Sequence, residues 1–244
     1  MLSKKEIKDI QSLGLKKHRE EMKLFVAEGP KIVKELVQLV PSQLQRVYAL
    51  DKWIEENKEL VDPSRLTAIS EAELERISQL QTPNNVLAVL KQFEHPEPDS
   101  SSFTLYLDTI QDPGNFGTIV RIADWFGIKN MVCTSGCADL YSPKVVQSTM
   151  ASIARVHVFY DEAGDWLPKQ HVPVYAATLN GKPVYELGKA ATGILLVGNE
   201  SKGLRDSFIQ MATEKITIPR IGGAESLNAA VATGIILSHL TGGS

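Results

Sequence analysis

The sequence predicts an α/β protein in which a small N-terminal α/β sandwich precedes a larger domain built on a parallel sheet. Apolar, β-favouring runs alternate with amphipathic helical patterns along most of the 244 residues. A linker-like stretch interrupts this alternation once, and the strands after it are almost continuously apolar. Because the chain is long enough for two cores of ordinary size, we expect two domains.

The N-terminal part alternates short strands with helices. The expected elements are a strand at 24–29, a helix from Pro30 to about Val40, a strand at 46–50, a helix from Asp51, a third strand, a helix at 71–80 and a strand at 86–93. Ser70 and Glu73 have the spacing of a capping box, which marks the start of the last helix. This order of elements is typical of a small α/β sandwich.

A linker separates the two domains. The segment 93–102 reads FEHPEPDSSS and combines two prolines, three serines and several acidic residues with little apolar content. Such a composition joins units that fold independently. We therefore expect a first domain at 1–95, a linker at 96–102 and a second domain at 103–244.

The second domain contains near-continuous apolar strands separated mostly by amphipathic helices. The strands are expected at 104–110, 130–136, 155–160, 173–179, 193–199 and 215–219. Buried strands with helical crossovers indicate a parallel sheet that is covered on both faces. Ligands of such sheets bind beyond the carboxyl ends of the strands, so the residues that follow each strand are the first candidates for a site.

Composition excludes several classes of protein. The net charge is −3, and the most continuous apolar stretch, Ala229–Leu237, is far shorter than the roughly 20 residues that span a bilayer. Two cysteines, Cys133 and Cys137, are too few for a disulfide framework or a four-ligand zinc site. The charged N-terminus does not resemble a secretory signal. We expect a cytoplasmic protein that uses no metal.

A basic cluster lies near the N-terminus. Residues 1–34 hold nine Lys or Arg against five acidic residues. Within this segment, Lys16, Lys17, Arg19 and Lys23 are candidates for contacts with nucleic-acid phosphates. The pattern also fits a solvated helix face, and charge alone favours this simpler interpretation.

Three segments that follow strands of the second domain carry unusual side chains. The first runs from Asp108 to Gly127 and places Asn115 near the start of a helix and Arg121 within it, among apolar neighbours. Asparagine and glycine at such a turn can be ordinary turn chemistry. An arginine in an apolar stretch usually needs an anionic partner, which a structural carboxylate or a bound phosphate would supply.

The second segment, LLVGNESKGL at 195–204, delivers Gly198, Asn199 and Glu200 into a loop. A glycine at a strand end permits close approach of a ligand to the backbone. The residues after Gly203 do not complete a phosphate-binding P-loop, because Leu204 stands where such a loop needs lysine.

The third segment, 216–237, joins a strand that stops at Pro219 to a helix that begins near Ser226 and is rich in small residues. Small residues along one helix imply close packing of a neighbouring element. Ser226 and Asn228 can both serve as N-terminal caps of this helix.

Taken in order, the three segments resemble the three motifs of the SpoU-type RNA ribose 2'-O-methyltransferases of the SPOUT class. The resemblance rests on D-P-x-N-x-G-x-I-x-R, then G-N-E-x-x-G-L, then I-P-x-x-G-x-x-S-L-N, and covers residues 104–241. The segment 15–36, LKKHREEMKLFVAEGPKIVKEL, is similar to the ribosomal-protein-like RNA substrate-binding domain of this family. The resemblance implies a C-terminal domain with a trefoil knot that binds S-adenosylmethionine and forms a homodimer.

The resemblance also assigns residues. A cofactor-binding role falls to Thr178, Leu179, Asn180, Gly198, Asn199, Ile218 and Leu227, and a catalytic role falls to Asn115, Arg121, Glu200, Ser226 and Asn228. Family mechanisms give the base role to the arginine, but a guanidinium does not normally lose its proton in a protein. We therefore expect Arg121 to pair with the phosphate beside the target ribose, Asn115 to position it, and Glu200 to orient Arg121 or relay the proton.

The implied substrate is structured RNA, with ribosomal RNA favoured over transfer RNA because of the N-terminal domain. Two other functions fit parts of the sequence. A catalytically silent RNA-binding or ribosome-assembly protein would have no need of all five catalytic candidates. A dinucleotide-dependent oxidoreductase would need a G-x-G-x-x-G after the first strand of a domain, and neither domain has one.

Overall fold

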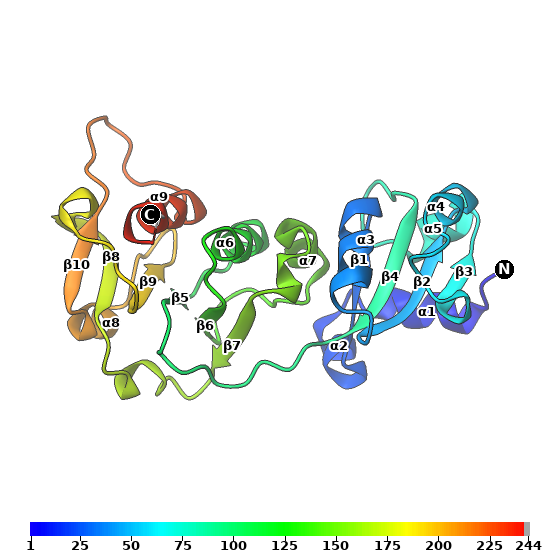
Figure 1. The fold of residues 1–244 in the computed structure, drawn as a ribbon, viewed down its shortest axis with the longest axis horizontal. Coiled ribbons are helices and arrows are strands. Elements are labelled where there is room, and N and C mark those ends of the chain that lie inside the picture. Colours follow the sequence, from blue (N-terminus) through cyan, green and yellow to red (C-terminus); the bar gives the residue numbers. More distant parts are fainter. Residues whose placement is uncertain (242–244) are drawn as a thin grey trace. The chain divides into compact units, whose positions relative to one another are not determined.

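The computed structural model describes residues 1–241 and divides into two compact units. Unit 1 comprises Met1–Glu94 and Asp139–Ala154, and unit 2 comprises His95–Ala138 and the chain from Arg155 onward (Figure 1). The sequence predicts that the segment 139–154 belongs to the second domain, whereas the structure groups it with unit 1.

Aromatic packing explains why that segment belongs to unit 1. The ring of Tyr141 lies 5.0 Å from the ring of Phe25 and 6.4 Å from that of Phe93. The following helix, α7 (Pro143–Thr149), packs against β1 (Leu24–Glu28). Arrays of buried aromatic rings contribute strongly to a core, so the segment is held by unit 1.

Unit 1 is built on a mixed sheet with the strand order β1-β4-β2-β3. Besides β1, its strands are β2 (Leu44–Ala49), β3 (Leu66–Ala68) and β4 (Val86–Lys91). β4 pairs antiparallel with β1 and β2, and β3 pairs parallel with β2. The strands lie where the apolar runs predicted them.

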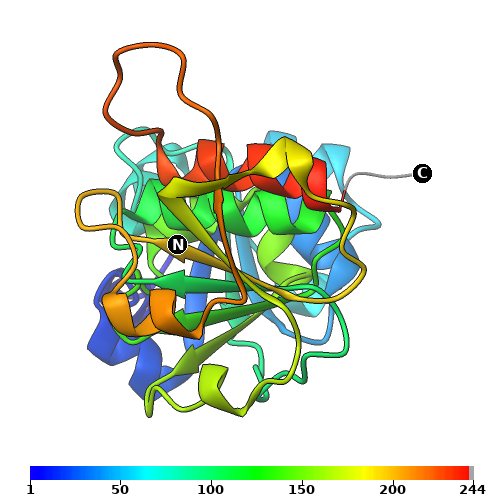
Figure 2. The ribbon, with the colours of Figure 1, turned by 90° about the vertical axis from the view of Figure 1, so that its left-hand side faces the viewer.

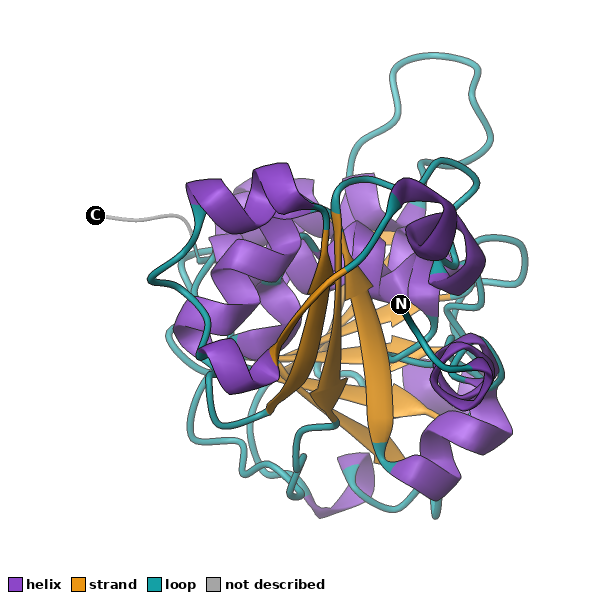
Figure 3. Ribbon diagram, turned by 90° about the vertical axis from the view of Figure 1, so that its right-hand side faces the viewer, coloured by secondary structure: helices purple, strands orange, loops and turns teal. Residues whose placement is uncertain are grey.

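Helices lie on both faces of this sheet (Figure 3). They are α1 (Lys4–Ser12), α2 (Lys16–Met22), α3 (Pro30–Leu39), α4 (Asp51–Glu56), α5 (Glu71–Ile77) and the 3-10 turns η1 (Pro63–Arg65) and η2 (Ser152–Ala154). α1 and α5 form a core with the strand residues Val26 and Leu87, whereas α3 packs against β1 and β4. Trp53 of α4 is also buried.

Two capping boxes fix helix starts in unit 1. Ser70 and Glu73 form the predicted one, in which the Ser70 hydroxyl accepts from the Glu73 amide and the Glu73 carboxylate accepts from the Ser70 amide. Ser3 and Glu6 form a second one at the start of α1, a helix that the sequence analysis does not predict. Each box satisfies two backbone donors that would otherwise lack partners.

Unit 2 contains a six-stranded sheet in the order β10-β8-β9-β5-β6-β7, and every pairing in it is parallel. The strands are β5 (Thr104–Asp108), β6 (Asn130–Thr134), β7 (His157–Asp161), β8 (Val174–Pro183), β9 (Ile194–Gly198) and β10 (Glu214–Thr217). The predicted parallel sheet of the second domain is thus confirmed.

Helices cover both faces of this sheet as well. α6 (Pro113–Trp125) and α9 (Ala229–Leu240) pack together on one face, and α8 (Asp206–Met211) lies on the other with η3 (Leu167–Lys169) (Figure 2). Leu204 and Phe208 of the α8 side belong to a buried cluster with Tyr106 and Trp166. No helix among residues 1–241 is long and apolar enough to cross a membrane.

The connection from β8 to β9 lies against the last turn of α9. It includes η4 (Val184–Glu186), and its Ala190 amide donates to the Leu240 carbonyl over 2.9 Å. The Lys189 ammonium donates to the His239 carbonyl over 2.6 Å. These bonds satisfy carbonyls that a helix end leaves without partners, and they fix α9 to the body of unit 2.

The segment before β5 is anchored to unit 2 by a tryptophan. The indole N–H of Trp166 donates to the Pro98 carbonyl over 2.8 Å, and the Trp166 side chain is fully buried. Part of the predicted linker is therefore packed against its own unit.

Candidate active site

The sheet of unit 2 has a switch point between β5 and β9. From β5 the chain continues outward through β6 and β7, whereas β9, β8 and β10 lie on the other side of β5. Asp108 and Gly198 are paired residues that end the two central strands. In open α/β sheets, ligands bind at such a point, outside the carboxyl ends of the strands.

Three polar side chains from three distant segments meet at this edge. The Asn115 amide nitrogen donates to Glu200 Oε1 over 2.6 Å. The Asn228 amide nitrogen donates to Asn115 Oδ1 over 2.8 Å. The structure thus brings together three of the five predicted catalytic residues in one hydrogen-bonded chain, which we call the polar junction (Asn115, Glu200 and Asn228).

Two helix starts support the polar junction. Asp112 caps α6 and accepts from the Asn115 amide over 2.8 Å. Asn228 caps α9, and its Oδ1 accepts from the amides of Ala230 and Val231 over 2.9 and 3.2 Å. The positive ends of two helix dipoles therefore lie beside the Glu200 carboxylate, which is a favourable place for a negative charge. Of the two predicted caps of α9, Asn228 is confirmed, and Ser226 lies before the helix begins.

The other two predicted catalytic residues lie outside the polar junction. Arg121 is exposed on α6, and no hydrogen bond or ion pair joins its guanidinium to any described residue. Ser226 is exposed in the loop between β10 and α9, which extends away from the sheet (Figure 2). Glu200 bonds to Asn115 and not to Arg121, so the expectation that Glu200 orients Arg121 is wrong for this arrangement.

The loop that follows β9 folds back, so that the backbone of Gly203 and Leu204 lies directly on Gly198. A Cβ atom at this position would approach the Gly203 carbonyl carbon and the Leu204 amide nitrogen, each to within 2.3 Å. The loop is closed by two backbone hydrogen bonds between Asn199 and Gly203, of 3.1 and 2.8 Å. Only glycine fits at the end of β9 when the loop is folded in this way.

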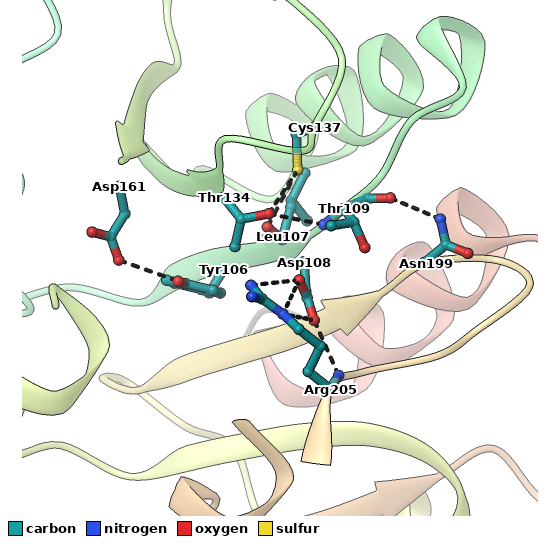
Figure 4. A network of polar contacts seen from close by, with 9 residues as sticks. All are labelled: Tyr106, Leu107, Asp108, Thr109, Thr134, Cys137, Asp161, Asn199 and Arg205. Atoms are coloured by element: carbon teal, nitrogen blue, oxygen red, sulfur yellow. Dashed lines mark hydrogen bonds and ion pairs between the residues drawn. The ribbon is translucent and has the colours of Figure 1, made fainter. Parts of the chain in front are cut away.

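Asn199 shapes the loop from within. Its Oδ1 accepts from the amides of Ser201 and Lys202 over 2.9 and 3.1 Å, and its Nδ2 donates to the Thr109 carbonyl over 2.8 Å (Figure 4). Thr109 has a left-handed backbone with a φ of 55°, a conformation that costs free energy in a β-branched residue. Asn199 therefore holds the loop on the end of β5, and its side-chain polar atoms are already engaged.

Further hydrogen bonds hold the end of β5 from the side of β6. The Thr109 amide donates to Thr134 Oγ1 over 3.0 Å, and Cys137 Sγ donates to the Leu107 carbonyl over 3.3 Å (Figure 4). Both cysteines are free thiols. The hydrogen bond from Cys133, helped by nearby backbone amides, holds the pKa of Cys137 below its usual value. The carboxyl end of β5 is thus bonded on both sides.

A bulge of β8 contains three of the predicted cofactor-binding residues. They are the ones that the sequence places at the end of the fourth strand of the second domain. β8 pairs with β9 only as far as Ala176, whereas its pairing with β10 shifts register and resumes at Lys182. The bulge therefore contains Thr178, Leu179 and Asn180, and Thr178 Oγ1 donates to the Asn180 carbonyl over 2.9 Å. The end of β10 joins the bulge, because Thr217 Oγ1 donates to the Leu179 carbonyl over 3.1 Å.

Apolar side chains near these strand ends are unusually exposed. Leu179 is 72% exposed and Leu227 is 47% exposed, while Ile218 is half-buried. Leucine is normally covered in a folded protein, and exposed apolar groups on polar loops often mark a ligand surface. Leu227 directly precedes Asn228, so the loop after β10 offers an apolar contact next to the polar junction, and the bulge of β8 offers a second one at the end of β10.

An ion pair that the sequence pattern does not predict lies at the end of the loop that follows β9. Asp108 is fully buried, and both of its carboxylate oxygens accept from Arg205 (Figure 4). A charged residue at the end of an otherwise apolar strand needs a partner, which was the available signal. Its partner stands 97 positions away along the chain, so spacing gave no indication of it.

The predicted RNA-binding residues separate into two groups. Lys16, Lys17 and Lys23 are exposed on α2 or at its end, with Lys16 and Lys17 within 4 Å of glutamates one turn on. Arg19 is 3% exposed, and its guanidinium donates to the Leu13 carbonyl over 2.8 Å and to Asp139 over 2.6 Å. Its prediction as a phosphate contact is wrong, because that guanidinium is already used inside unit 1.

Two family models match the chain. The SpoU rRNA Methylase family matches residues 102–238, and the MRM3-like substrate binding domain matches residues 4–88. Over 241 residues the chain is 30% identical to the 23S rRNA (guanosine(2553)-2'-O)-methyltransferase RlmP of Bacillus subtilis. The aligned region covers 97% of this chain and 96% of that protein.

Solved structures agree in fold over nearly the whole chain. A putative RNA methyltransferase of the TrmH family from Porphyromonas gingivalis is 36% identical, with a TM-score of 0.88 and 98% of each chain covered. An AdoMet-bound rRNA methyltransferase from Sinorhizobium meliloti is 29% identical, with a TM-score of 0.83 and coverage of 98% of this chain and 95% of that one.

Proposed function

The chain belongs to the SpoU rRNA methylase family, and from this we propose that it transfers a methyl group from S-adenosylmethionine to a ribose 2'-hydroxyl of ribosomal RNA. The observation that carries the proposal is the polar junction, where side chains from the three motif segments bond to one another at the switch point of the sheet. The names of the relatives favour ribosomal over transfer RNA as the substrate.

The residues at this edge fit S-adenosylmethionine. Because Gly198 has no side chain, the loop 199–203 folds directly onto the end of β9, and this holds the backbone groups of the loop at this edge. β8 and β9 stop pairing after Ala176, so the bulge of β8 at 178–180 does not take part in a ladder with β9. Thr178, Asn180 and the exposed Leu227 would add hydrogen bonds and apolar contact. When bound, the cofactor supplies an electrophilic methyl group on a sulfonium.

The protein's own residues then have to place the RNA hydroxyl and accept its proton. Arg121 has an exposed guanidinium, whose fork geometry suits the phosphate beside the target ribose. Glu200 Oε1 accepts from Asn115, and no described residue donates to Glu200 Oε2. We assign Glu200 as the group that takes the proton, with Asn115 and Asn228 fixing its position. Correct orientation of two reactants can lower a barrier by about 7–11 kcal/mol.

The N-terminal part recognises the RNA in this proposal. Residues 1–95 form the substrate-binding domain, 96–102 the linker and 103–244 the methyltransferase domain, in agreement with the ranges of the two family models. Lys16, Lys17 and Lys23 are available for phosphate contacts. The protein acts in the cytoplasm, where ribosomal RNA is present.

The proposal is tested by cofactor binding and by mapping of methyl groups. The purified protein is expected to bind S-adenosylmethionine in a calorimeter. Ribosomal RNA from cells that lack the gene should lose one 2'-O-methyl group, which the purified protein then restores. Loss of a methyl group from transfer RNA alone would contradict the ribosomal substrate. Absence of cofactor binding would favour a catalytically silent RNA-binding protein.

We also propose that the protein forms a homodimer through α6 and α9. The two helices run in the same direction, because Asn115 meets Asn228 at their starts and Ile122 lies beside Gly234 further along. Their outer surface carries Trp125, which is 84% exposed, and Val231, which is 51% exposed. Exposed aromatic and aliphatic groups on adjacent helices are typical of subunit interfaces.

Replacement of Trp125 by glutamate is expected to convert the dimer to a monomer, because it introduces a charge in place of the most exposed apolar side chain of this surface. Light scattering coupled to gel filtration measures the mass. Met211→Glu is the matched control, since Met211 is 42% exposed on α8, on the opposite face of the sheet. A Trp125→Glu protein that remains dimeric would place the interface elsewhere.

A further inference from the structure

In the ion pair between Asp108 and Arg205, both carboxylate oxygens contact the guanidinium, and one also accepts from the Arg205 backbone amide. Arg205 Nε lies 2.9 and 3.1 Å from the two Asp108 oxygens, and Arg205 Nη2 lies 2.9 Å from Oδ1. The Arg205 backbone amide also donates to Oδ2 over 3.1 Å. Fork-shaped pairs of this kind fix orientation as well as distance, because each donor direction is set by the planar guanidinium.

This pair fixes one end of the loop that follows β9. Asn199 bonds to the Thr109 carbonyl at the start of the loop, and Arg205 bonds to Asp108 at its end. The two anchors are consecutive residues, because Asp108 is the last residue of β5 and Thr109 follows it directly (Figure 4). The loop between them includes Glu200, so movement of the loop along β5 would break the hydrogen bond from Glu200 to Asn115.

The Arg205 side chain can be removed without leaving a cavity in the core. It is 55% exposed, and its guanidinium carbon lies 4.4 Å from the centre of the ring of Phe208, a buried residue whose ring the guanidinium covers from the outside. Asp108, by contrast, is fully buried, and a buried carboxylate without a partner is strongly unfavourable. Removal of the Arg205 side chain therefore destabilises the end of β5, where Asp108 loses its partner, and the loop that Arg205 anchors. The proposed cofactor site is formed at these two places.

We infer that Arg205 is a positioning residue for the proposed methyl transfer: its ion pair with Asp108 holds Gly198–Glu200 in the shape that receives the cofactor. The inference rests on the proposed function for the identity of the ligand. Arg205 itself touches neither substrate nor reacting atoms in this assignment, and it acts through the loop.

Four variants test the inference: Arg205→Ala, Arg205→Lys, Asp108→Asn with Arg205→Ala, and Arg155→Ala as the matched control. Arg155 forms a similar fork with Asp124, with contacts of 3.0, 2.9 and 2.8 Å, on another part of unit 2. Calorimetry measures S-adenosylmethionine affinity, hydrogen exchange measures opening of the loop without cofactor, and steady-state kinetics measure KM for RNA.

Arg205→Ala is expected to weaken cofactor affinity about 10- to 100-fold, the usual effect of losing hydrogen bonds to a charged group. Exchange should accelerate in residues 199–205 while the rest of unit 2 and the KM for RNA stay unchanged. Arg205→Lys should recover part of the affinity, because it keeps the charge but not the fork. The double variant, Asp108→Asn with Arg205→Ala, should bind the cofactor no more weakly than Arg205→Ala alone, since both changes break the same ion pair.

Two outcomes would overturn the inference. One is cofactor affinity and loop exchange in Arg205→Ala that match Arg155→Ala. The other is faster exchange throughout unit 2, which would make the pair a general stabiliser of the fold. If the wild-type protein binds no S-adenosylmethionine, the proposed function fails instead, and the exchange measurement still decides whether Arg205 restrains the loop.

Discussion

Replacement of Gly198 by alanine is expected to weaken S-adenosylmethionine binding by about 10- to 100-fold, because overpacking of this kind costs about 1–3 kcal/mol. The added methyl group would lie 2.3 Å from two backbone atoms of the returning loop, so no side-chain rotation relieves the contact. The loop must lift from β9, and Glu200 moves with it. Calorimetry with the purified variant gives the affinity.

Gly188→Ala provides the control for that experiment. Gly188 also belongs to unit 2, but no atom lies within 4 Å of the place where its Cβ would be. The Gly188→Ala protein should bind the cofactor with the affinity of the wild type. The circular dichroism spectra of the wild type, Gly188→Ala and Gly198→Ala should be the same. An unchanged affinity in Gly198→Ala would mean that the cofactor does not lie against the end of β9.

Replacement of Arg121 by alanine is expected to lower kcat/KM for RNA methylation by about 10²- to 10³-fold, the range seen when one donor to a reacting centre is removed. Cofactor affinity and the melting temperature should stay the same, because no described residue bonds to this exposed guanidinium. Single-turnover methylation of an RNA fragment measures the effect.

Lysine at position 121 distinguishes charge from geometry. It keeps a positive charge but cannot bind a phosphate through two parallel donors, so it should restore only part of the rate. Arg155→Ala serves as a control, since that arginine lies on another element and its partner is Asp124. A normal rate in Arg121→Ala would remove Arg121 from the mechanism.

Much of the fold could be predicted because the central strands of unit 2, β5, β6 and β9, are nearly continuous apolar runs. Burial on both faces leaves few other structures for runs such as 104–108 and 194–198. The parallel arrangement then places all carboxyl ends at one edge, which is why side chains as distant as Asn115 and Asn228 could be expected to meet.

Contacts that depend on the detailed path of loops could not be predicted. The basic pattern near the N-terminus carries no sign that Arg19 points inward to Asp139, because residues of the same charge differ in burial according to the tertiary fold. Similarly, the motif spacing is compatible with Glu200 bonding to Arg121 or to Asn115, and only the loop geometry selects Asn115. The register shift in β8 depends on its two neighbouring strands and leaves no local pattern.

The three tryptophans sample different surroundings, and this gives the protein built-in optical probes. Trp53 of unit 1 and Trp166 of unit 2 are 3% and 1% exposed, whereas Trp125 is 84% exposed. Their fluorescence should therefore emit at different wavelengths and differ in access to a dissolved quencher. Trp125 reports association of chains, while the two shielded indoles report melting of their own units, so one spectrum can follow these events without any attached dye.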